Sequence, residues 1–128
     1  MTKTQIVTDQ APAAIGPYSQ AIKANNMLFM SGQIPINPIT GKFDSAADVR
    51  TQAVQVMENL QAVLKSEGLN WDNVVRCEIF LDSISDFSVV NEVYGSYFEG
   101  MVPPARQTME VGALPLGVKV EISAIAVY

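Results

Sequence analysis

The sequence predicts an α+β domain in which two helices cover one face of a mixed β-sheet. Two segments, 46–67 and 86–99, place apolar residues at helical spacing, and the segments around them have the composition of strands. The expected order is therefore β-β-β-α-β-α-β-β. The chain has 128 residues, of which 48% are hydrophobic, so we expect a single domain, residues 1–128, with a core of its own.

Three strands are expected before the first helix. A loop rich in proline and glycine over residues 11–20 separates the first two strands. Asn25-Asn26 suits a tight hairpin between the second and third strands, because asparagine tolerates positive φ. The third strand contains Ser31-Gly32, and a glycine inside a strand indicates either a bulge or a close approach of backbone or ligand. The expected strands are residues 3–8, Ala21–Ala24 and Met27–Ile34.

Two helices flank a strand in the middle of the chain. The first, residues 46–67, is expected to begin at the N-cap Ser45 and to end at the glycine Gly68. The second, residues 86–99, carries Phe87, Val90, Tyr94 and Phe98 on one side. Between the helices, residues 73–82 alternate, with one face made of Val75, Cys77, Ile79 and Leu81 and the other of Val74, Arg76, Glu78 and Phe80.

Two strands, residues 105–112 and 118–127, are expected to close the sheet around a turn over 113–117. In the last strand, Val120 and the residues in phase with it suit the face under the helices, and Glu121 lies on the other face. In the preceding strand, Met109 and Val111 are assigned to the helix face, whereas Arg106, Thr108 and Glu110 are assigned to the opposite one. Arg106 and Glu121 then share the helix-free face, if the two strands pair in a register that preserves the core.

The helix-free face also carries large apolar residues, namely Phe80, Ile125 and Val127. An uncovered apolar sheet face usually marks an interface, and a second copy of the same chain is the natural cover. We therefore expect a homo-oligomer with ligand clefts at the subunit boundaries.

Composition excludes several classes of function. The net charge of −5 and the pI near 4.5 disfavour binding to nucleic acid, which needs a basic surface. Because the chain has no histidine and one cysteine, Cys77, it cannot hold a Ser-His-Asp triad, an internal disulfide or a histidine- or cysteine-rich metal site. We see no signal peptide and no apolar run long enough to cross a bilayer, so a soluble, cytoplasmic protein is expected.

Arg106 and Glu121 are the first candidates for chemistry. Arginine grips a planar carboxylate through two parallel hydrogen bonds, and a nearby glutamate can orient or activate a water. The pair therefore indicates hydrolysis of a small carboxylate-bearing molecule. Structural roles compete with this interpretation, because Arg106 could instead pair with Glu110 or another acid, and Glu121 with Lys119 or Arg76.

Further candidates have structural alternatives that are the more usual ones. Tyr18 could pack its loop onto the domain or lie over a ligand. Asn91 is ordinarily a solvated residue of a helix, and Cys77 falls on the expected core face as an inert thiol.

Taken together, five motifs resemble the RidA (YjgF-type) family over nearly the whole chain. Each is weak alone, but their order and spacing match the family. They are Gly16-Pro17-Tyr18-Ser19-Gln20-Ala21, Ser31-Gly32-Gln33-Ile34, Asn91 before Tyr94, Pro104-Ala105-Arg106, and Val120-Glu121-Ile122 with Ala124-Ile125-Ala126.

The resemblance implies a fold similar to that of trimeric chorismate mutase and a homotrimer with clefts between its subunits. It also implies deamination of 2-imino acids, such as 2-iminobutanoate and 2-iminopropanoate, to 2-oxo acids and ammonia, with no metal or cofactor. Arg106 would clamp the substrate carboxylate, Glu121 would position the attacking water, and Thr108 would contribute partly through its backbone. The cleft would be lined by Tyr18, Ser31, Gly32 and Asn91.

One departure from the family pattern keeps a second hypothesis open. Many active members have cysteine where this chain has Thr108, and threonine supplies no thiol. A regulatory protein that binds 2-oxo acids in the same cleft without turnover is therefore the alternative. Ribonuclease activity is disfavoured, because the acidic chain lacks both a phosphate-binding surface and histidine.

Overall fold

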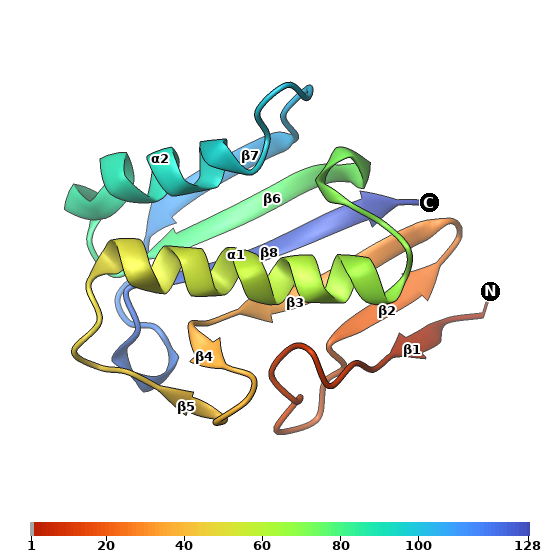
Figure 1. Ribbon diagram of the computed structural model, residues 1–128, viewed down its shortest axis with the longest axis horizontal. Helices are drawn as coiled ribbons and strands as arrows, with labels where there is room; N and C mark the ends of the chain where they lie inside the picture. The colour runs from red at the N-terminus through yellow and green to blue at the C-terminus, as the bar shows by residue number, and fades with distance from the viewer. Residues whose placement is uncertain (1) are drawn as a thin grey trace.

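The computed structural model describes residues 2–128 and confirms an α+β fold with two helices on one face of a mixed sheet (Figure 1). The six strands of the sheet lie in the order β1-β2-β3-β8-β6-β7. In chain order, the strands of this sheet and the two helices are β1 (Thr4–Ile6), β2 (Ala21–Ala24), β3 (Met27–Gln33), α1 (Val49–Ser66), β6 (Val74–Leu81), α2 (Phe87–Ser96), β7 (Ala105–Glu110) and β8 (Val120–Val127).

Short elements connect these segments. The loop expected after β3 contains a small two-stranded sheet that the sequence did not reveal, formed by β4 (Ile36–Asn37) and β5 (Lys42–Phe43). Single 3₁₀ turns lie at Trp71–Asn73, Ile84–Asp86 and Pro115–Gly117. Within residues 2–128, neither helix combines the length and apolar character needed to cross a lipid bilayer.

The β2–β3 hairpin forms as predicted. Asn25 and Asn26 have φ values of 49° and 63°, the left-handed conformation that a two-residue hairpin loop of this kind requires. The expected irregularity in β3 is present as well, because its register against β8 shifts between Met30 and Gln33. Ser31 and Gly32 form this bulge.

Helix α1 begins three residues later than predicted. Its N-cap is Asp48, whose Oδ1 accepts a hydrogen bond from the backbone N–H of Thr51 at 2.8 Å. Ser45 lies outside the helix and has no capping role, so the predicted cap was wrong. The other end agrees with the prediction, since Gly68 follows the C-cap Glu67 with a φ of 69°.

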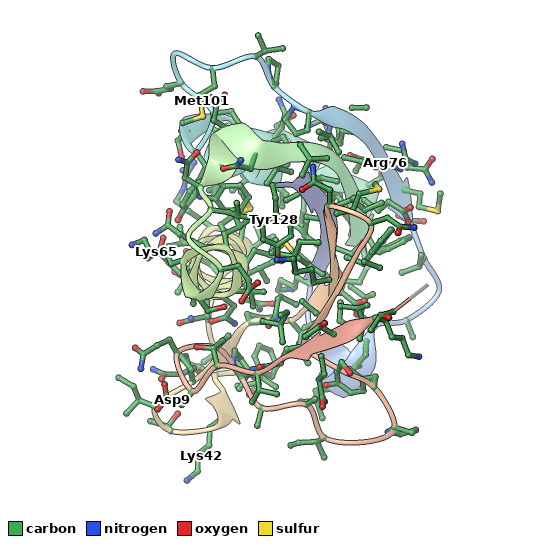
Figure 2. All side chains as sticks on the ribbon, turned by 90° about the vertical axis from the view of Figure 1, so that its right-hand side faces the viewer. Asp9, Lys42, Lys65, Arg76, Met101 and Tyr128 are labelled. Carbon is green, nitrogen blue, oxygen red and sulfur yellow. The ribbon has the colours of Figure 1, made fainter. Side chains whose placement is uncertain are left out.

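The core lies between the two helices and the sheet. In β8 every second residue from Val120 to Ala126 is buried, which confirms the predicted faces of that strand. Figure 2 shows the two sides of the sheet, with Lys65 of α1 on the helix side and Arg76 of β6 on the other. The fully buried side chains at the centre include Leu28, Met57, Leu60, Leu64, Ile79, Leu81 and Ile122.

Strand β6 departs from the predicted alternation at its first residues. Val74 is buried and Val75 is 42% exposed, the reverse of the expected assignment. The reason is a register shift against β8 between Val74 and Arg76, which inserts one residue and exchanges the faces before it. From Cys77 onward the predicted faces hold.

The largest correction concerns β7. This strand does not pair with β8 as a hairpin; it lies at the edge of the sheet and pairs in parallel with β6, which separates it from β8. The helix α2 lies in the crossover between β6 and β7, so the chain returns in the same direction (Figure 1). Because Arg106 is paired with Cys77 and Thr108 with Ile79, both side chains belong to the helix face.

The remaining residues of β7 shift accordingly. Glu110, paired with Leu81, also belongs to the helix face, and Met109, paired with Phe80, belongs to the opposite face. The predicted faces of this strand were therefore inverted. An exposed edge strand has no burial pattern strong enough to reveal its orientation, and five of the six residues of β7 are exposed.

Candidate functional site

Arg106 lies at the edge of the sheet against one stripe of α2. Its Nη1 donates a hydrogen bond of 2.5 Å to Oδ1 of Asn91. The centre of its guanidinium lies 5.1 Å from the ring centroid of Tyr94 and 5.6 Å from that of Phe87. These residues are spaced i, i+4 and i+7 on the helix, so they share one face. The proline pair before β7 brings the chain to this position.

No carboxylate neutralises Arg106 within residues 2–128. The arginine–carboxylate ion pairs in this part of the chain are Arg50–Glu92 and Arg76–Glu78. Glu110, the acid that could have paired with Arg106, instead accepts a hydrogen bond from the backbone N–H of Ile84 at 2.8 Å. The structural alternative for Arg106 is therefore wrong, and most of its five N–H donors stay available to an anion.

Thr108 lies two residues along the same strand and on the same face as Arg106. Its Oγ1 is buried and has no hydrogen-bond partner in the described part of the chain. The buried hydroxyl of Tyr94 likewise lacks a conventional partner and faces the weakly hydrogen-bonding thiol of Cys77. Burial raises the pKa of that thiol, so Cys77 is a protonated core residue, as predicted. We call Arg106, Asn91 and Thr108 the Arg106 half-site.

Glu121 opens into a cleft of about 470 Å³ at the start of β8. Tyr18 and Gly32 line the same cleft, so the structure brings together three of the predicted site residues. Apart from the glutamate, the walls are mainly apolar. They include Pro12, Ala13, Ile15, Ile34, Ile36, Pro115 and Leu116.

The carboxylate of Glu121 has neither a hydrogen bond nor an ion pair within residues 2–128. Arg76, one predicted partner, contacts Glu78 and Gln107 instead. Burial without compensation raises the pKa of Glu121. A carboxylate in this state is a stronger base than an exposed one, which suits proton exchange with a bound water.

Gly32 makes the position of Glu121 possible. A Cβ atom added to Gly32 would overlap Oε2 of Glu121 and lie 3.1 Å from its Cδ. The glycine in β3 is therefore explained in two ways at once, since it belongs to the bulge and also admits a side chain from the neighbouring strand.

Ser31 connects the bulge to the loop that carries Tyr18. Its hydroxyl donates to the carbonyl of Ser19 at 2.6 Å, and its backbone N–H donates to the carbonyl of Gln20 at 3.0 Å. Tyr18 itself is 52% exposed and points into the open cleft rather than into the core. We call Tyr18, Ser31, Gly32 and Glu121 the Glu121 half-site.

The two half-sites lie on opposite faces of the sheet in one chain. Arg106 is paired with Cys77 and Glu121 with Phe80, and these two partners are three residues apart on β6, so they point to opposite sides. The prediction that Arg106 and Glu121 share a face was therefore wrong for a single chain. The cause is that β7 pairs with β6 and not with β8, so its side chains lie on the faces opposite to those predicted.

Sequence reasoning missed residues that lie beside both half-sites. It placed Phe87 and Tyr94 on the apolar side of the helix but gave them no part in the site, although their spacing from Asn91 indicates that all three face the same neighbour. Leu116, in the rim of the cleft, is 68% exposed with a φ of 58°. No pattern in the sequence indicates that a leucine adopts this conformation, which is uncommon for a non-glycine residue.

Known proteins resemble this chain over its full length. Residues 8–128 match the family described as Endoribonuclease L-PSP. Protein DfrA of Myxococcus xanthus is 57% identical, covering 99% of this chain and 97% of its own. The 2-iminobutanoate/2-iminopropanoate deaminase of Escherichia coli K12 is 45% identical, covering 99% of this chain and 98% of its own. The crystal structure of YyfA from Yersinia pestis, of the conserved Rid family, has a TM-score of 0.96 at 49% identity, with 99% and 100% covered.

These similarities identify the chain as a member of the RidA (YjgF-type) family, which the Endoribonuclease L-PSP description covers. The resemblance drawn from the motifs is thereby confirmed, together with the chorismate-mutase-like fold. The family includes proteins named as imine deaminases and others with less specific names.

Proposed function

We propose that this protein hydrolyses 2-imino acids, such as 2-iminobutanoate and 2-iminopropanoate, to 2-oxo acids and ammonia. One observation carries the proposal: within residues 2–128, Arg106 has no acidic partner and Glu121 has no basic one. The first is a receptor for a carboxylate, and the second is a base for a water. The deaminase among the relatives supports the same reaction.

The two half-sites of one chain cannot reach the same ligand, so the proposal requires a second copy of the chain. The helix-free face offers the surface for it, because Phe29 is 42% exposed there and Phe80, Ile125 and Val127 belong to the same face. We propose a homotrimer in which the Arg106 half-site of one subunit faces the Glu121 half-site of the next. Each cleft would then hold one arginine and one glutamate.

The reaction in such a cleft needs no covalent intermediate with the protein. Arg106 holds the substrate carboxylate and so fixes the position of the imine carbon. The substrate reacts as its iminium form, with nitrogen already protonated by solvent. Glu121 takes a proton from a water as the water oxygen bonds to the iminium carbon, and the C=N electron pair moves to nitrogen to give a neutral amine. The protonated Glu121 then gives its proton to that amine. The C–N bond breaks as the hydroxyl oxygen forms the C=O bond, the hydroxyl proton passes to the Glu121 carboxylate and then to solvent, and ammonia leaves with the 2-oxo acid. Thr108 lies beside Arg106 and contributes its backbone and hydroxyl to the wall.

The direct test is the decay of imines generated in situ by an amino-acid oxidase or a serine or threonine dehydratase. The wild-type protein should accelerate their loss, and Arg106→Ala should lower kcat/KM roughly 30-fold or more, because a substrate carboxylate is left unpaired. Arg50→Ala is the matched control, since Arg50 is an exposed arginine already paired with Glu92.

The outcome separates the two hypotheses that the sequence left open. Equal activity of the Arg106→Ala and wild-type proteins would contradict the proposed site. Arg106-dependent binding of 2-oxobutanoate without any acceleration would instead indicate the regulatory binding protein.

A further inference from the structure

The stripe of α2 that meets Arg106 contains two aromatic residues for which the proposed reaction gives no role. Phe87 and Tyr94 present their rings to the guanidinium at 5.6 and 5.1 Å, on either side of Asn91 along the helix. Phe87 is 36% exposed, whereas Val90 and Val93 of the same helix are buried. The helix is thus anchored to the core without Phe87, and packing alone does not explain the ring.

We propose that Phe87 and Tyr94 are positioning residues that hold the Arg106 guanidinium ready for the carboxylate of the substrate. This inference rests on the proposed function, because it concerns the receptor for the 2-imino acid. The rings act through Arg106 and need not touch the ligand.

Such positioning would strengthen ligand binding because an arginine side chain on an exposed strand is otherwise free to change rotamer. A free guanidinium loses rotamer entropy when it binds a ligand, and this loss weakens binding. The ring faces attract the cation, and guanidinium stacks on aromatic rings more readily than ammonium does. The hydrogen bond to Asn91 uses one N–H and fixes the rotation of the plane. The restriction is therefore imposed before the ligand arrives, and the remaining N–H groups stay available.

Arg106 has no acidic partner among residues 2–128, and this fits the arrangement. An ion pair would also hold the side chain, but it would occupy the donors that a carboxylate needs. Aromatic faces and one amide oxygen hold the arginine without neutralising it. Arg76 of the neighbouring strand β6 and Lys119, the residue before β8, are not held by rings in the described part of the chain.

The experiment uses Phe87→Leu, which keeps an apolar side chain but removes the ring. Tyr94 is 5% exposed and belongs to the core, so its replacement would disturb folding and Phe87 is the better probe. We expect KM for the imine and Kd for 2-oxobutanoate to rise roughly two- to fivefold, with a much smaller change in kcat. Phe87→Tyr should restore both constants. Phe43→Leu, the same change at a ring of β5 that faces no cation, is the matched control.

Besides an unaltered Kd in Phe87→Leu, two results would overturn the proposal. One is an equal effect of Phe87→Leu and Phe43→Leu on Kd. The other is a further loss of 2-oxobutanoate affinity when Phe87→Leu is added to Arg106→Ala, because a residue that acts through Arg106 has no effect once Arg106 is gone. The Kd measurements need no turnover. A wild-type protein that binds 2-oxobutanoate but leaves imines unchanged would refute the deaminase alone, whereas an unaltered Kd in Phe87→Leu would refute the positioning role alone.

Discussion

Glu121 and Gly32 show how two residues on neighbouring strands depend on each other. The carboxylate occupies the space where any larger residue at position 32 would place its Cβ atom. The carboxylate is also half-buried and unpaired, and burial raises its pKa. A glycine in the bulge of β3 is therefore a requirement of the site, although on the sequence alone it could equally have been a requirement of the strand.

We expect Gly32→Ala to impair activity more than folding. The added methyl group displaces the end of a flexible side chain, so the free energy of unfolding should fall by about 1 kcal/mol or less. The displaced carboxylate no longer positions the water, and kcat/KM should fall roughly 10- to 100-fold. Kinetics and urea denaturation of the same preparations measure the two effects. Gly95→Ala is the control, because a Cβ there meets no atom within 4 Å and alanine should stabilise α2 by about 1 kcal/mol.

The raised pKa of Glu121 predicts the acid limb of the pH profile. A raised pKa means that Glu121 takes up its proton at a higher pH than a free glutamate, whose pKa is 4.5. Only the carboxylate accepts a proton from water, so kcat/KM should fall as the pH drops through the raised pKa of Glu121. The limb should disappear in Glu121→Gln, along with most of the activity, and persist in Glu99→Gln, which changes an exposed glutamate. A wild-type profile that stays flat down to pH 4 would argue against the proposed role.

At the scale of elements, the helices decide where the functional side chains lie. The helix α2 is part of the crossover that makes β7 parallel to β6, and it also supplies Asn91, Phe87 and Tyr94 to Arg106. The helix α1 covers the centre of the sheet, and its Asn59 donates hydrogen bonds to the carbonyls of Ile34 and Ile36, next to the Glu121 cleft. Both half-sites are therefore attached to helices that pack on the same core.

The start of α1 offers a clear test of the assigned cap. Asp48→Ala removes the acceptor for the N–H of Thr51, whereas Ser45→Ala changes a residue outside the helix. We expect Asp48→Ala to lower the urea midpoint and Ser45→Ala to leave it unchanged. The hydrogen bond to Thr51 lowers the pKa of Asp48, so its stabilising effect is present at neutral pH and is lost as the pH falls through that lowered value. Equal midpoints at pH 7 for the two variants would contradict the assignment.

At the scale of the whole molecule, one chain holds both candidate half-sites but does not bring them together. The Arg106 half-site lies on the helix side of an edge strand, and the Glu121 half-site opens on the other side of the sheet. The proposed assembly resolves this separation, because each subunit then offers one half-site to each of its two neighbours. The exposed apolar side chains of the helix-free face would be covered by the same contact.

Mixing two inactive variants tests whether the site is shared. Arg106→Ala keeps an intact Glu121, and Glu121→Gln keeps an intact Arg106. If each cleft takes its arginine and its glutamate from different subunits, unfolding and refolding an equal mixture should restore about a quarter of the clefts. Activity near 25% of the wild-type value is therefore expected, while each variant refolded alone stays inactive. A mixture as inactive as its components would show that both residues act within one subunit.

The amino-acid sequence by itself determined the order of the helices and of the strands of the main sheet, the faces of β8, the asparagine hairpin and the identity of the candidate residues. These features follow from local patterns, because burial alternates along a strand that is covered on one side and turns require particular residues. The family follows from the sequence too, since its motifs are read in order along the chain.

Only the tertiary structure decided which strands pair, and thus where Arg106 points. The edge strand β7 is exposed on most of its residues, so no alternation distinguishes its two faces, and the connection through α2 sets its direction. One insertion in β6 likewise exchanged Val74 and Val75, because a register shift is a property of two strands and not of one. The separation of Arg106 from Glu121 has the same origin: it depends on pairing between segments distant in sequence.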